Sequence, residues 1–340
     1  MATIHNVDMA SINKIFELIN NDPGGAVIAL APAFKNNKQY FDRGFNCLAV
    51  FDRLKWRCRT KYDVRSHGIT PSSTYASMVG PLFNVVVVES FASKCPKLEI
   101  VDFSNTDLTD MGLITVVNYC PNINSIDLSN THVFDLSVAH MVKNLQLQEL
   151  NLNCVDITSI QTIKTIAQHC PDLACIELCN NVCLGDEWIY ELLYGCNKLK
   201  QLNLAGCNIS HKSMAHIGTS LRLTLTHLYI DDTNVCDLGI SLLNKCKNLY
   251  ACSMSRTNIT NHGITQMSKG CSSLVYVDVV HTDVTLPGVL SLARNCPKLE
   301  TISINGDCLS FEDAHGIELL YPNIICNVNA VYDSDDEYDW

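Results

Sequence analysis

The sequence lacks the segments that mark a membrane-spanning or exported protein. No stretch approaches the roughly 18 consecutive apolar residues that a transmembrane helix needs. No basic region precedes an apolar run near Met1, as a signal peptide requires, and the Arg and Ser bias of a transit peptide is missing. We therefore expect a cytoplasmic or nuclear protein with no membrane partner.

Basic charge is also scarce. Lys and Arg number 24 against 35 Asp and Glu, which gives a formal net charge of −11. Five of the acidic residues lie in the last eight positions, so the rest of the chain carries −6. Nucleic acids and anionic membranes attract clusters of Lys and Arg. This balance argues against both as partners.

Motifs of catalysis and metal binding are missing as well. The sequence contains no G-x-x-x-x-G-K-[ST], no G-x-S-x-G and no H-E-x-x-H. The 18 cysteines include no C-x-x-C pair, so the usual spacing of a zinc site is absent, and the 11 histidines are scattered. We expect no catalytic residues, no metal and no cofactor, and hence a protein that is not an enzyme.

What the sequence does contain is a phrase that returns at a nearly constant interval. It begins with Cys and places Leu or Ile three residues later, as in Cys95-Pro-Lys-Leu98 and Cys196-Asn-Lys-Leu199. Seven cysteines open such copies, and weaker copies open at Asn144 and Arg222, so that successive openings are 24 to 26 residues apart. A unit this small cannot bury its apolar face alone. The period therefore predicts a solenoid of about nine to ten stacked repeats.

The repeat that opens at Cys170 indicates the structure of one unit. Ile176 and Leu178 alternate as in a strand that faces a core with every second residue. Asn181 stands where the backbone must turn, a place that Thr or Cys takes in other repeats. Apolar residues at helical spacing follow over 188–193, and Gly195 is a helix stop. The opening cysteines are predicted to be reduced, small buried residues.

This repeat resembles the cysteine-containing subclass of leucine-rich repeats, whose consensus is C-x-x-L-x-x-L-x-L-x-x-C/T-x-x-[IL]-[ST]-[DN]-x-[GA]. Thr109-Asp110-x-Gly112 and Thr260-Asn261-x-Gly263 reproduce even the turn element. The resemblance covers residues 95 to about 326. It implies an α/β fold, a curved leucine-rich-repeat horseshoe with parallel strands on the concave side and helices on the convex side.

The chain divides into four predicted segments. These are a helical segment over 1–52, irregular N-terminal cap repeats over 53–94, regular repeats over 95–328 and an acidic tail over 329–340. Caps are expected because a solenoid without them leaves its terminal apolar faces in water. Residues 319–328 are predicted to form one last strand with no helix after it.

The first segment resembles an F-box, a short helical motif. Val7-Asp8 takes the place of that family's Leu-Pro, Ile15-Phe16 stands at its Ile-Phe pair, and Leu18 follows. The resemblance implies that Ile15, Phe16 and Leu18 contact a Skp-type adaptor of a cullin ubiquitin ligase. The alternative is a helical cap that binds no partner.

The concave face carries the candidate partner-binding residues. In L-x-x-L-x-L, the residues between the core positions point outward, and several of them are acidic or aromatic. The predicted binding residues are Asp102, Asp127, Glu177, His227, Tyr229 and Asp231. A Tyr side chain that lies between acidic residues is typical of a surface that contacts a basic or Arg-bearing partner. The alternative is that these are ordinary polar residues on a solvent-facing strand.

These features predict a protein that recognises another protein on its concave face. The resemblance to F-box leucine-rich-repeat proteins implies the substrate receptor of a cullin-type ubiquitin ligase. The alternative is a scaffold or inhibitor of the same repeat family that lacks an F-box and acts by occupying its partner.

Overall fold

A computed structural model describes residues 88–89, 92–93 and 95–329, together with the backbone of residues 75–77. The predicted helical segment 1–52, most of the predicted cap 53–94 and the tail from residue 330 lie outside the described residues. The chain separates into two compact units, which meet between Asp156 and Ile157 in the sequence.

The first unit alternates strands and helices. Its elements are β1 (Tyr75–Ser77), β2 (Ile100–Asp102), α5 (Asp110–Tyr119), β3 (Ser125–Asp127), α6 (Asp135–Asn144) and β4 (Glu149–Asn151). The strands pair in parallel and in chain order, with Ile100 opposite Ser125 and Ser125 opposite Glu149.

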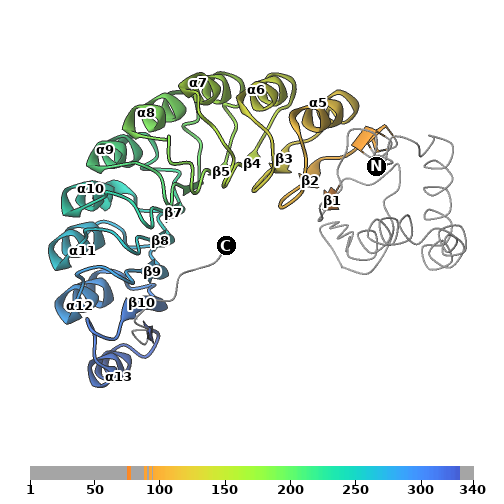
Figure 1. The fold of residues 1–340 in the computed structure, drawn as a ribbon. Coiled ribbons are helices and arrows are strands. Elements are labelled where there is room, and N and C mark those ends of the chain that lie inside the picture. Colours follow the sequence, from red (N-terminus) through yellow and green to blue (C-terminus); the bar gives the residue numbers. More distant parts are fainter. Residues whose placement is uncertain (1–74, 78–87, 90–91, 94, 330–340) are drawn as a thin grey trace, which may run out of the picture. The chain divides into compact units, whose positions relative to one another are not determined.

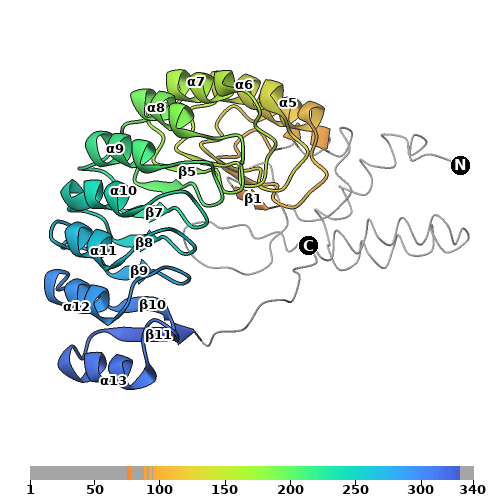
Figure 2. The ribbon, with the colours of Figure 1, turned by 60° about the vertical axis from the view of Figure 1, so that its left-hand side comes forward.

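The second unit continues the same alternation. Its elements are α7 (Ile160–His169), β5 (Cys175–Glu177), α8 (Asp186–Gly195), β6 (Gln201–Asn203), α9 (His211–Ser220), β7 (His227–Tyr229), α10 (Asp237–Ser241), the 3-10 helix η2 (Leu242–Lys245), β8 (Ala251–Ser253), α11 (Asn261–Ser268), β9 (Tyr276–Asp278), α12 (Leu286–Asn295), β10 (Thr301–Asn305), α13 (Phe311–Leu320) and β11 (Ile325–Asn329). Strands β5 to β11 pair in parallel and in chain order, and they line the inner side of an arc whose outer side is formed by the helices (Figure 1; Figure 2). This is the leucine-rich-repeat solenoid that the period predicts.

The core lies between the strand layer and the helix layer. Leu173, Ile176 and Leu178 of one repeat are all fully buried, as are Ile189 and Leu192 on the inner face of α8. Burial of a side chain of this size contributes about 1.5–3 kcal/mol. The predicted phase of the strand, with every second residue in the core, is therefore confirmed.

A single polar side chain closes the turn after six of the strands. The Thr233 hydroxyl donates a hydrogen bond to the carbonyl oxygen of Ile230 at 2.6 Å. The side-chain amide of Asn181 donates to the carbonyl oxygen of Leu178 at 2.9 Å. The equivalent hydrogen bond, from a Thr hydroxyl to the carbonyl oxygen three residues earlier in the chain, is made by Thr106, Thr131, Thr257 and Thr282. The predicted role of this position is confirmed.

The N-terminus of a helix is bound by a side chain from the preceding repeat. The Asp186 carboxylate accepts hydrogen bonds from the backbone N–H of Ser210 at 2.9 Å and of Ser213 at 3.0 Å, and from both hydroxyls at 2.6 Å. Asn261 accepts from the N–H groups of Thr285 and Gly288 in the same way. The first N–H groups of a helix have no partner within it, so these side chains connect one repeat to the next.

The opening cysteines are buried, as predicted. Cys95, Cys120, Cys170, Cys196, Cys246, Cys271 and Cys296 all lie in the core. Several donate the thiol to a carbonyl of the preceding repeat, as Cys296 does to Cys271 at 3.5 Å. Cys suits this buried position as a small apolar residue with a weak donor, whereas Leu145 and Leu221 fill it in the two repeats that lack the cysteine.

The C-terminal end of the repeats differs from the prediction. Leu319 and Leu320 belong to the end of α13, and the last strand, β11, begins only at Ile325. Pro322 lies between them, and a helix ordinarily stops before the residue that precedes a proline. The prediction of one strand over residues 319–328 was wrong at its N-terminal half.

Candidate functional site

The outward-facing residues of the strands form continuous rows in each unit. In the second unit Glu177 lies opposite Asn203, which lies opposite Tyr229. The row continues through Ser253, Asp278 and Ser303 on the next three strands. In the first unit Asp102 lies opposite Asp127. These rows have the register that the repeat predicts.

A shallow hollow of about 270 Å³ lies on the strand face of the second unit. Its lining comes from three consecutive strands: Glu177 of β5, Gln201, Leu202 and Asn203 of β6, and Tyr229 of β7. Leu202 is fully buried. The hollow thus combines a carboxylate, two amides and a phenol.

His227 lies beside the hollow, on the same strand as Tyr229 and opposite Gln201. Its Nδ1 is 2.9 Å from the Thr226 hydroxyl oxygen, and that hydroxyl donates its proton to the carbonyl oxygen of Lys200 at 2.9 Å. The Gln201 amide nitrogen lies 3.5 Å from the same Nδ1, so this ring nitrogen has polar neighbours on β6 and just before β7.

Both rings beside the hollow are electrically neutral near pH 7. Burial lowers the pKa of His227, which favours the uncharged imidazole. Burial raises the pKa of Tyr229, and the charge of Glu177 raises that pKa further. The Tyr250 ring packs against His227 at a tilt, with 5.4 Å between the ring centroids. The hollow therefore has aromatic surface on the β7 side.

Asp231 is held in a hydrogen-bonded network that extends away from the hollow. Its carboxylate accepts from the Ser253 hydroxyl and, at 2.8 Å, from the Ser255 N–H. The Ser255 hydroxyl donates to Asp278 at 2.8 Å, and the Tyr276 hydroxyl donates to the same carboxylate at 3.1 Å. Asp231 and Asp278 are thus fixed in position with their negative charges on the strand face.

The two predicted binding residues of the first unit are engaged in local hydrogen bonds. Asp102 accepts from the Ser104 N–H at 2.9 Å. Asp127 accepts from Ser129 and, at 3.0 Å, from the Asn151 amide. Burial raises the pKa of Asp127 despite these bonds. Both side chains order the strand ends, and their binding role stays a prediction.

The structure therefore brings Glu177 and Tyr229 together in one hollow. His227 lies two residues before Tyr229 on β7, opposite Gln201, and Asp231 lies two residues beyond Tyr229. Sequence reasoning overlooked Gln201 and Tyr250, which lie just before or at the start of a strand. Their positions in the repeat, compared across copies, were the signal that could have found them. The predicted adaptor-binding residues Ile15, Phe16 and Leu18 lie outside the described residues.

Neither a metal site nor a membrane-spanning helix is found in the part of the chain that the structure describes. No group of three or more His, Cys, Asp or Glu side chains in it could hold a metal ion. No helix in it has the length and apolar character needed to cross a membrane.

The comparisons with known proteins concern the fold. No family model matches the chain, and no curated protein matches it. Among solved structures, an internalin from Listeria monocytogenes aligns with a TM-score of 0.47 at 18% sequence identity. The alignment covers 62% of this chain and 55% of the internalin chain, so it spans little more than half of that protein.

Proposed function

We propose that this protein binds a partner protein on the strand face of its second unit. The observation that carries the proposal is the polar hollow between Glu177 and Tyr229, with neutral aromatic rings on one side and fixed carboxylates beyond it. Interfaces place their binding energy in a few aromatic or charged contacts at the centre of a patch. Polar side chains held in position by their own network bind without a large ordering cost.

Capture from a cell extract tests the surface when matched variants are compared. Tyr229→Ala removes a tyrosine ring from the strand face. Tyr194→Ala removes a tyrosine ring from α8, where Tyr194 is 81% exposed. We expect the Tyr229→Ala variant to lose the proteins that the parent captures and the Tyr194→Ala variant to keep them. Quantitative mass spectrometry of the captured proteins measures both. Loss with Tyr194→Ala alone would place binding on the helices and contradict the proposal.

The finer form of the proposal is a substrate receptor of a cullin-type ubiquitin ligase. It is supported by the resemblance of the repeats to F-box leucine-rich-repeat proteins and by Ile15-Phe16 and Leu18 in the N-terminal segment. In this form the N-terminal segment contacts a Skp-type adaptor, and the strand face holds the substrate. Co-purification with the adaptor is the test, because only this form requires it.

The alternative is a scaffold or inhibitor that binds the same partner surface without a ligase. This alternative is supported by a departure from the F-box motif: where that family has Leu-Pro, this sequence has Val7-Asp8. An extract in which the strand face captures a protein but no Skp-type adaptor co-purifies would favour this alternative.

A further inference from the structure

We infer that the hollow between Glu177 and Tyr229 receives an arginine side chain of the partner protein; this inference rests on the proposed protein-binding function and specifies the chemistry of its central contact.

The size of the hollow fits a side chain better than a free ligand. Its volume of about 270 Å³ lies below the roughly 300–1,000 Å³ of pockets that enclose small molecules. It is open along the strand face, and residues of the three neighbouring strands β5, β6 and β7 line it. A group delivered from outside on the surface of a partner can enter such a hollow, whereas a free molecule would remain largely in water.

The lining selects a positively charged group. Glu177 supplies the carboxylate, and none of the five lining residues is basic. Asp231 and Asp278 add negative charge on the following strands, where hydrogen bonds hold them in place. A partner cation is attracted to this part of the face at long range and is paired at Glu177 at short range.

The geometry favours guanidinium over ammonium. Glu177 and Tyr229 lie on strands that are two intervals apart, roughly 9–10 Å between the backbones. A planar guanidinium has donors on both edges, so it can bond a carboxylate on one side and further acceptors on the other. The acceptor that lines the hollow on the β7 side is the Tyr229 hydroxyl oxygen. An ammonium is a compact point charge that cannot reach both sides at once.

The aromatic rings add to the preference. Guanidinium groups stack on the faces of neutral aromatic rings, with the attraction greatest where water is excluded. Tyr229 lines the hollow itself, and the ring of Tyr250, the residue before β8, packs against His227. Since His227 is neutral, it does not repel an incoming cation.

The binding of labelled peptides to the full-length protein tests the inference. The probes are nona-arginine and nona-lysine, which have the same charge, measured by fluorescence anisotropy at physiological salt. We expect the parent protein to bind nona-arginine more tightly than nona-lysine, and Glu177→Gln to weaken nona-arginine by about tenfold, the cost of losing one charge-assisted hydrogen-bonded contact.

Glu187→Gln is the matched control, because it removes the same charge from an exposed position on α8. We expect it to change nona-arginine binding by less than about twofold, since exposed charges are screened at this salt concentration. Tyr229→Phe should weaken nona-arginine less than Tyr229→Ala, because it keeps the ring. Each variant is first shown to melt as the parent does.

Equal affinity for the two peptides, or equal loss with Glu177→Gln and Glu187→Gln, would overturn the arginine site. That result leaves the protein-binding proposal standing if Tyr229→Ala still abolishes capture from extract. If Tyr229→Ala also leaves the captured proteins unchanged, the protein-binding proposal fails as well.

Discussion

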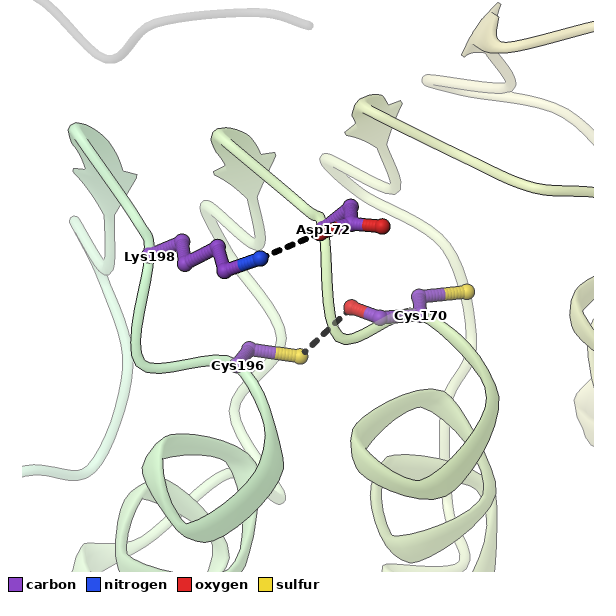
Figure 3. Close-up of polar contacts among 4 residues, drawn as sticks. All are labelled: Cys170, Asp172, Cys196 and Lys198. Atoms are coloured by element: carbon purple, nitrogen blue, oxygen red, sulfur yellow. Dashed lines mark hydrogen bonds and ion pairs between the residues drawn. The ribbon is translucent and has the colours of Figure 1, made fainter.

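The thiol of Cys196 donates a hydrogen bond to the carbonyl oxygen of Cys170, which opens the preceding repeat, across 3.3 Å (Figure 3). Two residues beyond each cysteine, the Lys198 ammonium pairs with the Asp172 carboxylate at 2.6 Å, an exposed contact that contributes little. The same relation recurs between Cys120 and Cys95 at 3.3 Å. Cys120 and Cys196 are thus both small core residues and links to the preceding repeat.

Thiol labelling should separate the cysteines by burial. Burial, together with the neighbouring Cys170 thiol, raises the pKa of Cys196 to about 12, so that it stays protonated and unreactive at pH 8. Cys154 and Cys183 are exposed. Among the cysteines that the structure describes, we expect iodoacetamide to modify these two first and Cys196 only when the protein unfolds, as followed by peptide mass spectrometry. Labelling of Cys196 as fast as Cys183 in the folded protein would contradict its stacked position.

Gly195 should tolerate no side chain. A Cβ there would lie 1.9 Å from the carbonyl oxygen of Ala167 on the preceding helix, whereas a Cβ at Gly316 in α13 would meet nothing within 4 Å. We expect Gly195→Ala to lower the free energy of unfolding by about 1–3 kcal/mol or more. Gly316→Ala should leave it unchanged or raise it by about 0.5–1 kcal/mol, because Ala is the better helix former. Urea unfolding measures both, and equal effects would refute the close helix contact.

Asp186 should stabilise the protein in a pH-dependent way. Burial opposes its charge, but the hydrogen bonds from Ser210 and Ser213 outweigh burial and lower its pKa below 3.8. Its contribution is therefore present above about pH 4 and is lost as the pH falls through the lowered pKa. We expect Asp186→Ala to cost about 1–2 kcal/mol at pH 7, as the loss of a helix cap does.

The control for this prediction is Glu187→Ala at the exposed neighbouring position, which should cost less than about 0.5 kcal/mol. Urea unfolding at a series of pH values should show the difference between the parent and Asp186→Ala narrowing below about pH 4. A difference that stays constant down to pH 3 would show that the charge of Asp186 does not carry the effect.

Leu204 tests the phase of the strands. Its side chain is fully buried, whereas Leu223, in the loop before β7, is 71% exposed. We expect Leu204→Ala to cost about 2–5 kcal/mol of unfolding free energy and Leu223→Ala to cost less than about 0.5 kcal/mol. Chemical denaturation measures both. A cost below about 1 kcal/mol for Leu204→Ala would contradict its place in the core.

The repeat fold could be predicted from the sequence because its determinants are local. The alternation of Ile176 and Leu178 and the turn at Asn181 are properties of one unit, and the constant interval copies them along the chain. The register of Glu177, Asn203 and Tyr229 follows from that interval. These features could be predicted without knowing how one repeat is rotated against the next.

The candidate site could be predicted only in part, because its details depend on contacts between repeats. The lining by Gln201 and the position of Tyr250 against His227 arise from adjacent strands. The polar contacts of the His227 ring involve Thr226 and, from the preceding repeat, Gln201. A sequence pattern gives the type of residue in a row, but not which side chains meet across it.

The N-terminal segment offers the sharpest test of the ligase proposal. If Ile15 and Phe16 contact a Skp-type adaptor, changing both to Ala should abolish adaptor binding while the melting temperature of the protein stays the same, because the interfaces between repeats determine the stability of a solenoid. If the segment only caps the repeats, the double change should lower the melting temperature, and the parent protein should bind no adaptor. Co-purification and thermal melting of the same two proteins distinguish these outcomes. Adaptor binding that persists in the double variant would show that Ile15 and Phe16 are not the contacts, since removing two large apolar side chains from the centre of an interface ordinarily costs several kcal/mol of binding free energy.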